Sequence, residues 1–260
     1  MERFLMKPIL LFVTLYTLTI LSGCGSDPIT DNWPVDVLYQ EAKDALDVGD
    51  YETAIKYYEI LEARYPFGKY AQQAQLDIIY GYYKYEEPES ALVAADRFIK
   101  LYPRHSNVDY VYYLKGLINF ELDQGMLDRF LPLDHSQRDP TASKRAFQEF
   151  SELLRRFPNS RYSQDARQRM IHLRNRLAKH ELHVAKFYMK RSAYLAAANR
   201  AKTVVQAYPR TPAVPEALVI MAKAYKIMAL NDLSDNALKV LTLNYPNHKG
   251  IAEVNNLVVK

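Results

Sequence analysis

Residues 49–66 read GDYETAIKYYEILEARYP, and this stretch decides the fold of the chain. It ends in an aromatic residue followed by proline, and a small residue stands twelve positions before the proline. The same spacing recurs along the chain. The aromatic-proline pairs are Tyr65-Pro66, Tyr102-Pro103, Phe157-Pro158, Tyr208-Pro209 and Tyr245-Pro246, and the small residues are Ala54, Ala91, Ala146, Ala197 and Ser234.

This phasing predicts stacked helix pairs. Ala42 and Ala222 lie twelve positions before Ala54 and Ser234, which gives the first and last pairs two small residues where their helices pass closely. Proline stops a helix, so each aromatic-proline pair closes a second helix. The pattern resembles the tetratricopeptide repeat (TPR), whose period is about 34 residues. With only 8 glycines in 260 residues, we expect an all-α superhelix of about five helix pairs whose first helices line a concave binding surface.

The repeats are unequal in length, since the intervals between successive prolines are 37, 55, 51 and 37 residues. In the third repeat, residues 123–140 break the periodicity and are expected to form a loop. In the fourth, Ser163 to His180 is expected to be an extra helix inserted before the pair. We therefore predict a boundary near Pro158, with an N-terminal half at residues 35–158, a C-terminal half at 159–246 and a tail at 247–260.

The N-terminus has the layout of a secretory signal. Arg3 and Lys7 precede an apolar run from Pro8 to Leu21 that is too short for a comfortable membrane span. The only cysteine, Cys24, follows the small residues Ser22 and Gly23, which resembles the lipobox of bacterial lipoproteins. We expect residues 1–23 to be cleaved; the alternative is an ordinary signal peptide with a chance cysteine.

Acylation is the one covalent modification that the sequence predicts. S-diacylglycerol and an N-acyl chain on Cys24 would hold the protein on a bilayer without a transmembrane helix. Gly25, rather than aspartate, permits onward sorting to the outer membrane in the lipoproteins that this chain resembles. Residues 24–34 have the turn-forming composition of a tether, and the predicted location is the periplasmic leaflet. No other cofactor and no metal is expected.

The sequence gives little support to an enzyme. His180-Glu181-Leu182-His183 is not the zinc motif His-Glu-x-x-His, and we interpret its histidines as surface residues. No phosphate-binding glycine loop and no nucleophile elbow is present. The prediction is a non-enzymatic protein.

Charge is distributed unevenly along the chain. The segment from Asp36 to Lys100 has a net charge of −6, whereas the segment from Arg138 to Lys202 has a net charge of +11. A periplasmic protein meets no nucleic acid, so the basic segment is expected to face an acidic protein partner or lipid headgroups. The alternative is that these charges merely solvate helices.

Many of the 21 tyrosines fall on predicted first helices. Helical phasing directs one set of residues toward the concave side, where they would form an aromatic channel with two lysines for an extended peptide. The alternative is that half of them are core residues between helices. The set is Tyr39, Lys43, Leu46, Tyr80, Tyr83, Lys84, Tyr110, Tyr113 and Phe120.

Longer stretches resemble the BamD (ComL) family, TPR lipoproteins of the machinery that assembles β-barrels in the outer membrane. The likeness runs from Cys24 to about Pro246, but Met126 to Asp134 and the tail do not match closely. The stretches that carry it are Arg64-Tyr65-Pro66-Phe67-Gly68-Lys69-Tyr70, Asp96-Arg97-Phe98-Ile99, Asp109 to Leu117, Arg138-Asp139-Pro140, Pro158-Asn159-Ser160 and Arg176-Leu177-Ala178-Lys179.

This resemblance implies roles for particular residues and partners. The C-terminal half would hold a periplasmic POTRA domain of the barrel protein BamA through an arginine that matches Arg200, next to Asn199. The N-terminal half would receive C-terminal targeting segments of unfolded barrel proteins. Other Bam lipoproteins, BamC and BamE where present, would also be partners.

Two alternatives remain open at this point. The first is a TPR lipoprotein that pilots secretin pores or coordinates cell-wall synthesis. The second is a periplasmic hydrolase with the 123–140 loop as a lid, which would require Asp134, His135 or Asp139 for activity, although no nucleophile supports it.

Overall fold

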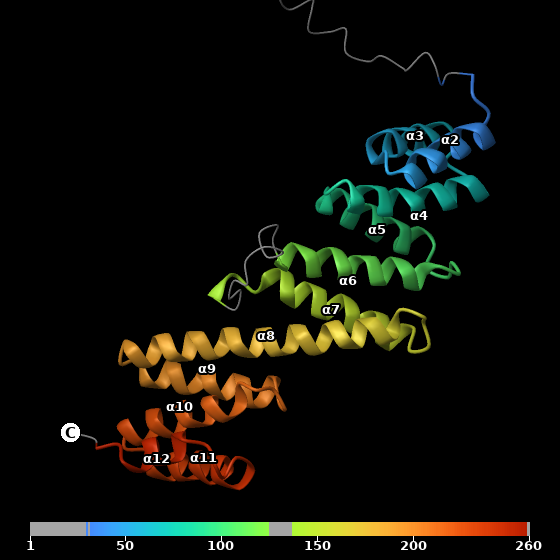
Figure 1. Cartoon of the computed structure of the whole chain (residues 1–260). Helices are drawn as coiled ribbons and strands as arrows, with labels where there is room; N and C mark the ends of the chain where they lie inside the picture. Colours follow the sequence, from blue (N-terminus) through green and yellow to red (C-terminus); the bar gives the residue numbers. More distant parts are fainter. Residues whose placement is uncertain (1–29, 31, 125–136, 259–260) are drawn as a thin grey trace, which may run out of the picture. The chain divides into compact units, whose positions relative to one another are not determined.

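A computed structural model describes residues 30, 32–124 and 137–258, and the part of the chain that it describes is helical, without strands (Figure 1). The predicted signal peptide, Cys24 and most of the tether lie outside these residues. The helices are α2 (Val35–Val48), α3 (Tyr51–Arg64), α4 (Lys69–Lys84), α5 (Pro88–Leu101), α6 (Val108–Gln124), α7 (Thr141–Arg156), α8 (Ser163–Lys190), α9 (Tyr194–Ala207), α10 (Val214–Ile227), α11 (Asn231–Asn244) and α12 (Gly250–Asn255).

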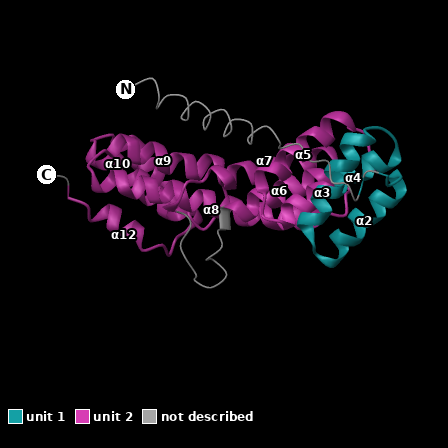
Figure 2. Cartoon of the chain, turned by 90° about the horizontal axis from the view of Figure 1, so that it is seen from above, with its two compact units in different colours: residues 1–77 teal, residues 78–260 magenta. Residues whose placement is uncertain are grey.

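The chain consists of two compact units, and the boundary between them falls within α4 (Figure 2). Unit 1 ends at Asp77 and contains α2, α3 and the first part of α4. Unit 2 runs from Ile78 to Lys260, and from α5 to α11 each of its helices packs against the next. The predicted boundary near Pro158 therefore lies inside unit 2, and a division into functional halves there stays a prediction.

The aromatic-proline pattern has one structural meaning throughout. The aromatic residue caps the second helix of each repeat, α3, α5, α7, α9 and α11, with φ between −124° and −139° and ψ between 53° and 65°. Its amide donates to the carbonyl four residues earlier, as Tyr65 does to Leu61 at 2.8 Å. The following proline cannot continue the helix because it has no amide hydrogen. This confirms the repeat pattern and the all-α TPR fold.

Small residues lie where paired helices approach closely. Ala54, Ala146 and Ala197 are fully buried. In the last pair, the Oγ of Ser234 donates to the carbonyl of Ala222 at 3.0 Å, so the two small positions are in direct contact. A larger side chain at either position would separate the helices.

The turns inside the helix pairs use left-handed residues. Gly49 has φ 86° and closes α2, and Ser192 and Ala229 take the same role after α8 and α10 with φ 57°. The next amide then donates to a carbonyl five residues back, as Leu230 does to Tyr225 at 2.9 Å. Glycine adopts this conformation without strain, whereas serine and alanine do not.

The added residues of the fourth repeat are helical, but they do not form a separate helix. They continue directly into the first helix of the pair, and α8 is a single helix of 28 residues. No glycine or proline occurs between Ser163 and Lys190, so nothing in the sequence ends the helix there. Leu173 packs in one hydrophobic cluster with α6 and α7, and Leu182 packs in a second with α9 and α10. The helix thus joins the two cores of unit 2.

The predicted loop and tail are only partly covered. Residues 125–136 lie outside the described residues, and Asp123 and Gln124 belong to α6 rather than to a loop. In the tail, α12 packs against α10 and α11. The Nζ of Lys226 donates to the carbonyls of Val254 and Asn255, at 2.8 and 3.2 Å, and so caps the end of α12.

Candidate functional site

One predicted channel residue of unit 1, Tyr39, bonds to a half-buried carboxylate, Asp77. The hydroxyls of Tyr39 and Tyr58 donate to Oδ2 of Asp77 at 2.9 and 3.4 Å, and Nε2 of Gln73 donates to its Oδ1 at 2.9 Å. Burial raises the pKa of Asp77, although these hydrogen bonds oppose the shift. Burial and the neighbouring carboxylate also raise the pKa values of Tyr39 and Tyr58. The hydroxyl of Tyr39 is therefore engaged by Asp77.

The other two unit 1 residues differ in accessibility. Lys43 forms an ion pair with Asp47 one turn further along α2 and remains partly accessible. Leu46 is only 8% exposed, so the expectation that it lines a binding surface is not met. It packs in the core because its turn of α2 faces α3.

In unit 2, tyrosines of one first helix bond to an acid on the next. The Tyr83 hydroxyl donates to Oε1 of Glu121 at 2.6 Å, and the Tyr113 hydroxyl donates to Oδ2 of Asp165 at 2.8 Å. The same oxygen of Asp165 accepts from Nε of Arg169 at 2.6 Å. Burial and the bonded carboxylate raise the pKa of both tyrosines. These contacts tie α4 to α6 and α6 to α8.

An aromatic stack lies beside these contacts. The rings of Tyr113 and Tyr162 are stacked at 4.7 Å with an interplanar angle of 16°, and Tyr110 lies 5.4 Å from Tyr162. The guanidinium of Arg161 lies over the Tyr162 ring at 4.7 Å. The structure thus brings Tyr110 and Tyr113 together through a residue, Tyr162, that the sequence analysis did not single out.

The remaining predicted residues of unit 2 separate into core and surface. Phe120 is only 7% exposed and belongs to the hydrophobic cluster with Phe150 and Leu173, so it does not line an accessible wall. Tyr80 lies 6.2 Å from Tyr83, and Lys84 is exposed at the end of α4. The accessible part of the predicted channel is therefore smaller than expected.

Sequence reasoning missed the acids that hold these tyrosines. Tyr39 and Asp77 are 38 residues apart, as are Tyr83 and Glu121. This distance is close to the repeat interval of 37 residues, so an acid one repeat after a first-helix tyrosine is a signal that could have identified both pairs. Asp165 is 52 residues after Tyr113 because the third repeat is longer.

The predicted partner residues lie on the outer part of α9. Nη1 of Arg200 donates to Oε2 of Glu181 on α8 at 3.0 Å. Glu181 is 5% exposed, whereas about half of the Arg200 side chain remains accessible. A buried carboxylate thus fixes one edge of the guanidinium, and the other donors stay available for a partner carboxylate.

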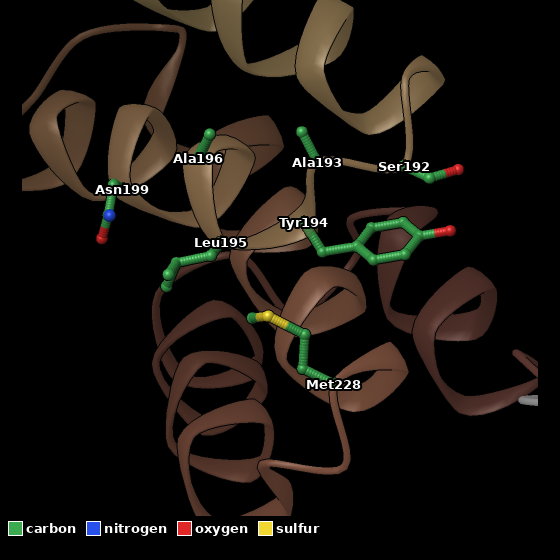
Figure 3. A pocket seen from close by; sticks show the side chains of 7 residues that line it. All are labelled: Ser192, Ala193, Tyr194, Leu195, Ala196, Asn199 and Met228. Carbon is green, nitrogen blue, oxygen red and sulfur yellow. The ribbon is translucent and has the colours of Figure 1, made fainter.

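Asn199 lines an open hollow of about 570 Å³ next to Arg200. Figure 3 shows the side chains around it, which come from the start of α9 and the end of α10. Leu195, which is 60% exposed, and Met228 give it an apolar character. The hollow is lined by Ser192, Ala193, Tyr194, Leu195, Ala196, Asn199 and Met228.

Of the three residues that the hydrolase alternative requires, the structure describes only Asp139. Asp134 and His135 lie outside the described residues. Oδ1 of Asp139 accepts from the amide and hydroxyl of Thr141, at 3.2 and 2.8 Å, which is a structural contact at the start of α7. None of the described helices combines the length and apolar character that crossing a membrane requires.

Comparisons with known proteins agree on one family. A family profile described as YfiO, an outer membrane lipoprotein, matches residues 31–241. Outer membrane protein assembly factor BamD of Neisseria meningitidis serogroup B is 46% identical over 248 residues, which cover 93% of this chain and 92% of that protein. BamD of Vibrio cholerae is 40% identical over 88% of this chain and 96% of its own length. BamD of Xylella fastidiosa strain Temecula1 is 38% identical over 92% of this chain and 83% of its own length.

Proposed function

Because this chain belongs to the BamD family of outer membrane protein assembly factors, we propose that it is a non-enzymatic adaptor of the β-barrel assembly machinery. It binds the periplasmic part of BamA with unit 2 and receives targeting segments of unfolded barrel proteins on its first-helix surface. Binding energy alone drives both steps.

The Arg200–Glu181 pair is the observation that carries the BamA contact. Arginine suits bidentate recognition of a carboxylate, and Glu181 holds its side chain in place before a partner arrives. The apolar hollow beside Asn199 supplies surface that an interface can bury. A POTRA domain with an acidic residue beside an apolar one is the partner that this surface fits.

The tyrosine clusters support the second role. In unit 2, Tyr110, Tyr113 and Tyr162 present partly accessible rings whose positions are fixed by stacking and by the bond to Asp165. Rigid aromatic surfaces bind extended apolar segments at low entropic cost. Lys84, in the same unit, adds positive charge for a terminal carboxylate.

Acylated Cys24 is the proposed anchor, and the periplasmic leaflet of the outer membrane is the proposed location. The description of the matched family as an outer membrane lipoprotein supports both. BamC and BamE are proposed partners where an organism has them.

Affinity purification of the detergent-solubilised, acylated protein tests this function. Arg200→Glu alone would place two carboxylates together, so the variant for the test is Glu181→Gln combined with Arg200→Glu. The control variants are Glu181→Gln alone and Lys202→Glu, which reverses an exposed charge on the same helix. Thermal unfolding of each variant establishes that it is folded.

We expect a POTRA-containing barrel protein to co-purify with the native chain and both controls, and to be lost with the double variant. Recovery of a secretin or a cell-wall synthase instead would support the alternative of a TPR lipoprotein that pilots secretin pores or coordinates cell-wall synthesis. Retention of the barrel protein by the double variant would show that Arg200 does not carry the contact.

A further inference from the structure

The turn between α3 and α4 exposes a large apolar side chain. Phe67 is 89% exposed, between Pro66, which cannot continue α3, and Gly68, whose φ of 104° turns the chain into α4. The amide of Gln72 donates to the carbonyl of Gly68 at 3.2 Å and starts the next helix. The turn thus holds Phe67 away from the core of unit 1.

The fold does not require a phenylalanine at this place. The same position, directly after the proline, is exposed and polar in the other four repeats. The residues there are Arg104, Asn159, Arg210 and Asn247. Since all five second helices end in the same backbone conformation, the apolar residue in the first repeat serves something other than the turn.

The charged residues nearest to Phe67 in the sequence are basic, although the longer segment that contains them is acidic. Residues 63–76 contain no acidic residue and two basic ones, Arg64 and Lys69, although the segment from Asp36 to Lys100 has a net charge of −6. Lys69 is exposed. An anionic surface would repel most of this segment but not the turn.

Thr30 and Trp33, which precede α2, are held beside this turn. The guanidinium of Arg64, the last residue of α3, donates to the carbonyl of Thr30 and, from Nη2, to its Oγ1 at 3.3 Å. The hydroxyl of Tyr65 donates to the carbonyl of Trp33 at 3.3 Å. Thr30 is fully buried. Thr30, six positions after Cys24, therefore lies at the end of unit 1 that carries Phe67.

Chain length limits how far this end can lie from a lipid at Cys24. The six steps from Cys24 to Thr30 span at most about 22 Å at full extension. Only three steps lead from Arg64 to Phe67, which corresponds to at most about 11 Å. If Cys24 is inserted in a bilayer, the turn is held close to its surface.

We propose that Phe67 is a second membrane anchor, which inserts into the phospholipid leaflet that holds acylated Cys24, with Lys69 at the level of the headgroups. This inference rests on the acylation of Cys24 in the proposed function. Phenylalanine buries apolar area at the boundary between headgroups and acyl chains, and lysine is attracted to anionic headgroups. The contact would fix the orientation of unit 1 on the membrane, which a flexible acyl tether alone cannot do.

Site-specific fluorescence tests the insertion in the full acylated chain. Trp33 is the only tryptophan, so Phe67→Trp in a Trp33→Phe background gives a single reporter. The matched control is Val48→Trp in the same background, because Val48 is 82% exposed and lies at the other end of α2, away from Thr30. Both proteins are reconstituted in phosphatidylethanolamine–phosphatidylglycerol vesicles, with or without bromine on the acyl chains, and circular dichroism verifies their helical content.

We expect the reporter at position 67 to shift to shorter wavelength and to lose most of its emission with brominated chains, while the reporter at position 48 changes little. Equal quenching at both positions, or none at position 67 in protein that floats with the vesicles, would overturn the insertion but leave the lipid anchor intact. Protein that does not float with vesicles would refute the anchor and the inference together. A shift of the emission at position 67 to shorter wavelength that appears only after a purified barrel-assembly partner is added, without quenching by brominated chains, would identify a protein contact instead of a lipid one.

Discussion

Gly116 allows α6 and α7 to pack at their observed separation. A Cβ at this position would lie 2.4 Å from Cε1 and 2.5 Å from Cδ1 of Phe150. Favourable carbon–carbon contacts are about 3.5–4.0 Å, so the ring would have to move by about 1 Å. Phe150 is fully buried, and its ring lies 6.1 Å from that of Tyr113. Displacing Phe150 would therefore disturb the aromatic cluster as well.

Two effects decide the outcome of Gly116→Ala. Overpacking a filled core costs about 1–3 kcal/mol, and alanine in place of glycine within a helix returns up to about 1 kcal/mol. The net expectation is a loss of about 1–2 kcal/mol. For a chain of this size, that lowers Tm by about 2–8 °C.

The assay is thermal unfolding followed by circular dichroism. Phe150→Leu removes the ring atoms that a new Cβ would meet, so Gly116→Ala should cost less in that background than in the native one. The difference between the two costs is the coupling energy of a double-mutant cycle. A Tm that rises with Gly116→Ala, or a cycle without coupling, would refute the close packing of α6 on α7.

Three further predictions concern turns, an ion pair and alkaline titration. Ser192→Gly and Ala229→Gly relieve left-handed backbones and should each raise the free energy of unfolding by about 0.5–1 kcal/mol in urea titrations, whereas Gly49→Ala should lower it. Arg200→Ala leaves the buried Glu181 without its guanidinium and should cost about 1–3 kcal/mol by the same assay, with a smaller loss for Arg200→Lys. The raised pKa values of Tyr39, Tyr58 and Tyr83 imply stability that is fully present below about pH 10, where unfolded tyrosine titrates, and is lost as pH rises through the folded-state values. Absorbance of tyrosinate should therefore appear together with the loss of helical signal; ordinary titration of these tyrosines in a folded protein would contradict this.

The fold could be predicted because the same sequence pattern recurs, so that each repeat supports the interpretation of the others. One aromatic-proline pair is weak support for a helix end, but five pairs, each with a small residue twelve positions earlier, leave few other structures. The limits of α8 were not predictable in the same way. Interruption of the repeat period at residues 163–180 indicates an insertion but does not say whether it ends before the next helix. The structure shows one continuous helix, which agrees with the absence of glycine and proline from this stretch.

The candidate surface was less predictable than the fold. Helical phase indicates on which side of a helix a residue lies, but not whether a neighbouring helix buries it. Leu46 and Phe120 have the phase of exposed channel residues, yet a neighbouring helix covers them. Tyr39, Tyr83 and Tyr113 remain partly accessible because each is bonded to a carboxylate of the following first helix. The hydroxyls of these first-helix tyrosines are held by a partner that belongs to another repeat, which the phase of a single helix does not reveal.

These tyrosine–acid bonds also restrict what the first-helix surface can recognise. A hydroxyl that donates to Asp77, Glu121 or Asp165 is not available to a ligand unless the ligand replaces the carboxylate. The rings remain available, so recognition rests on apolar and aromatic side chains rather than on a particular hydrogen-bond pattern. This tolerance fits the proposed role of the protein as an adaptor that receives many different barrel proteins. The same bonds join successive first helices, so the groups that position the rings also fix the spacing of the repeats.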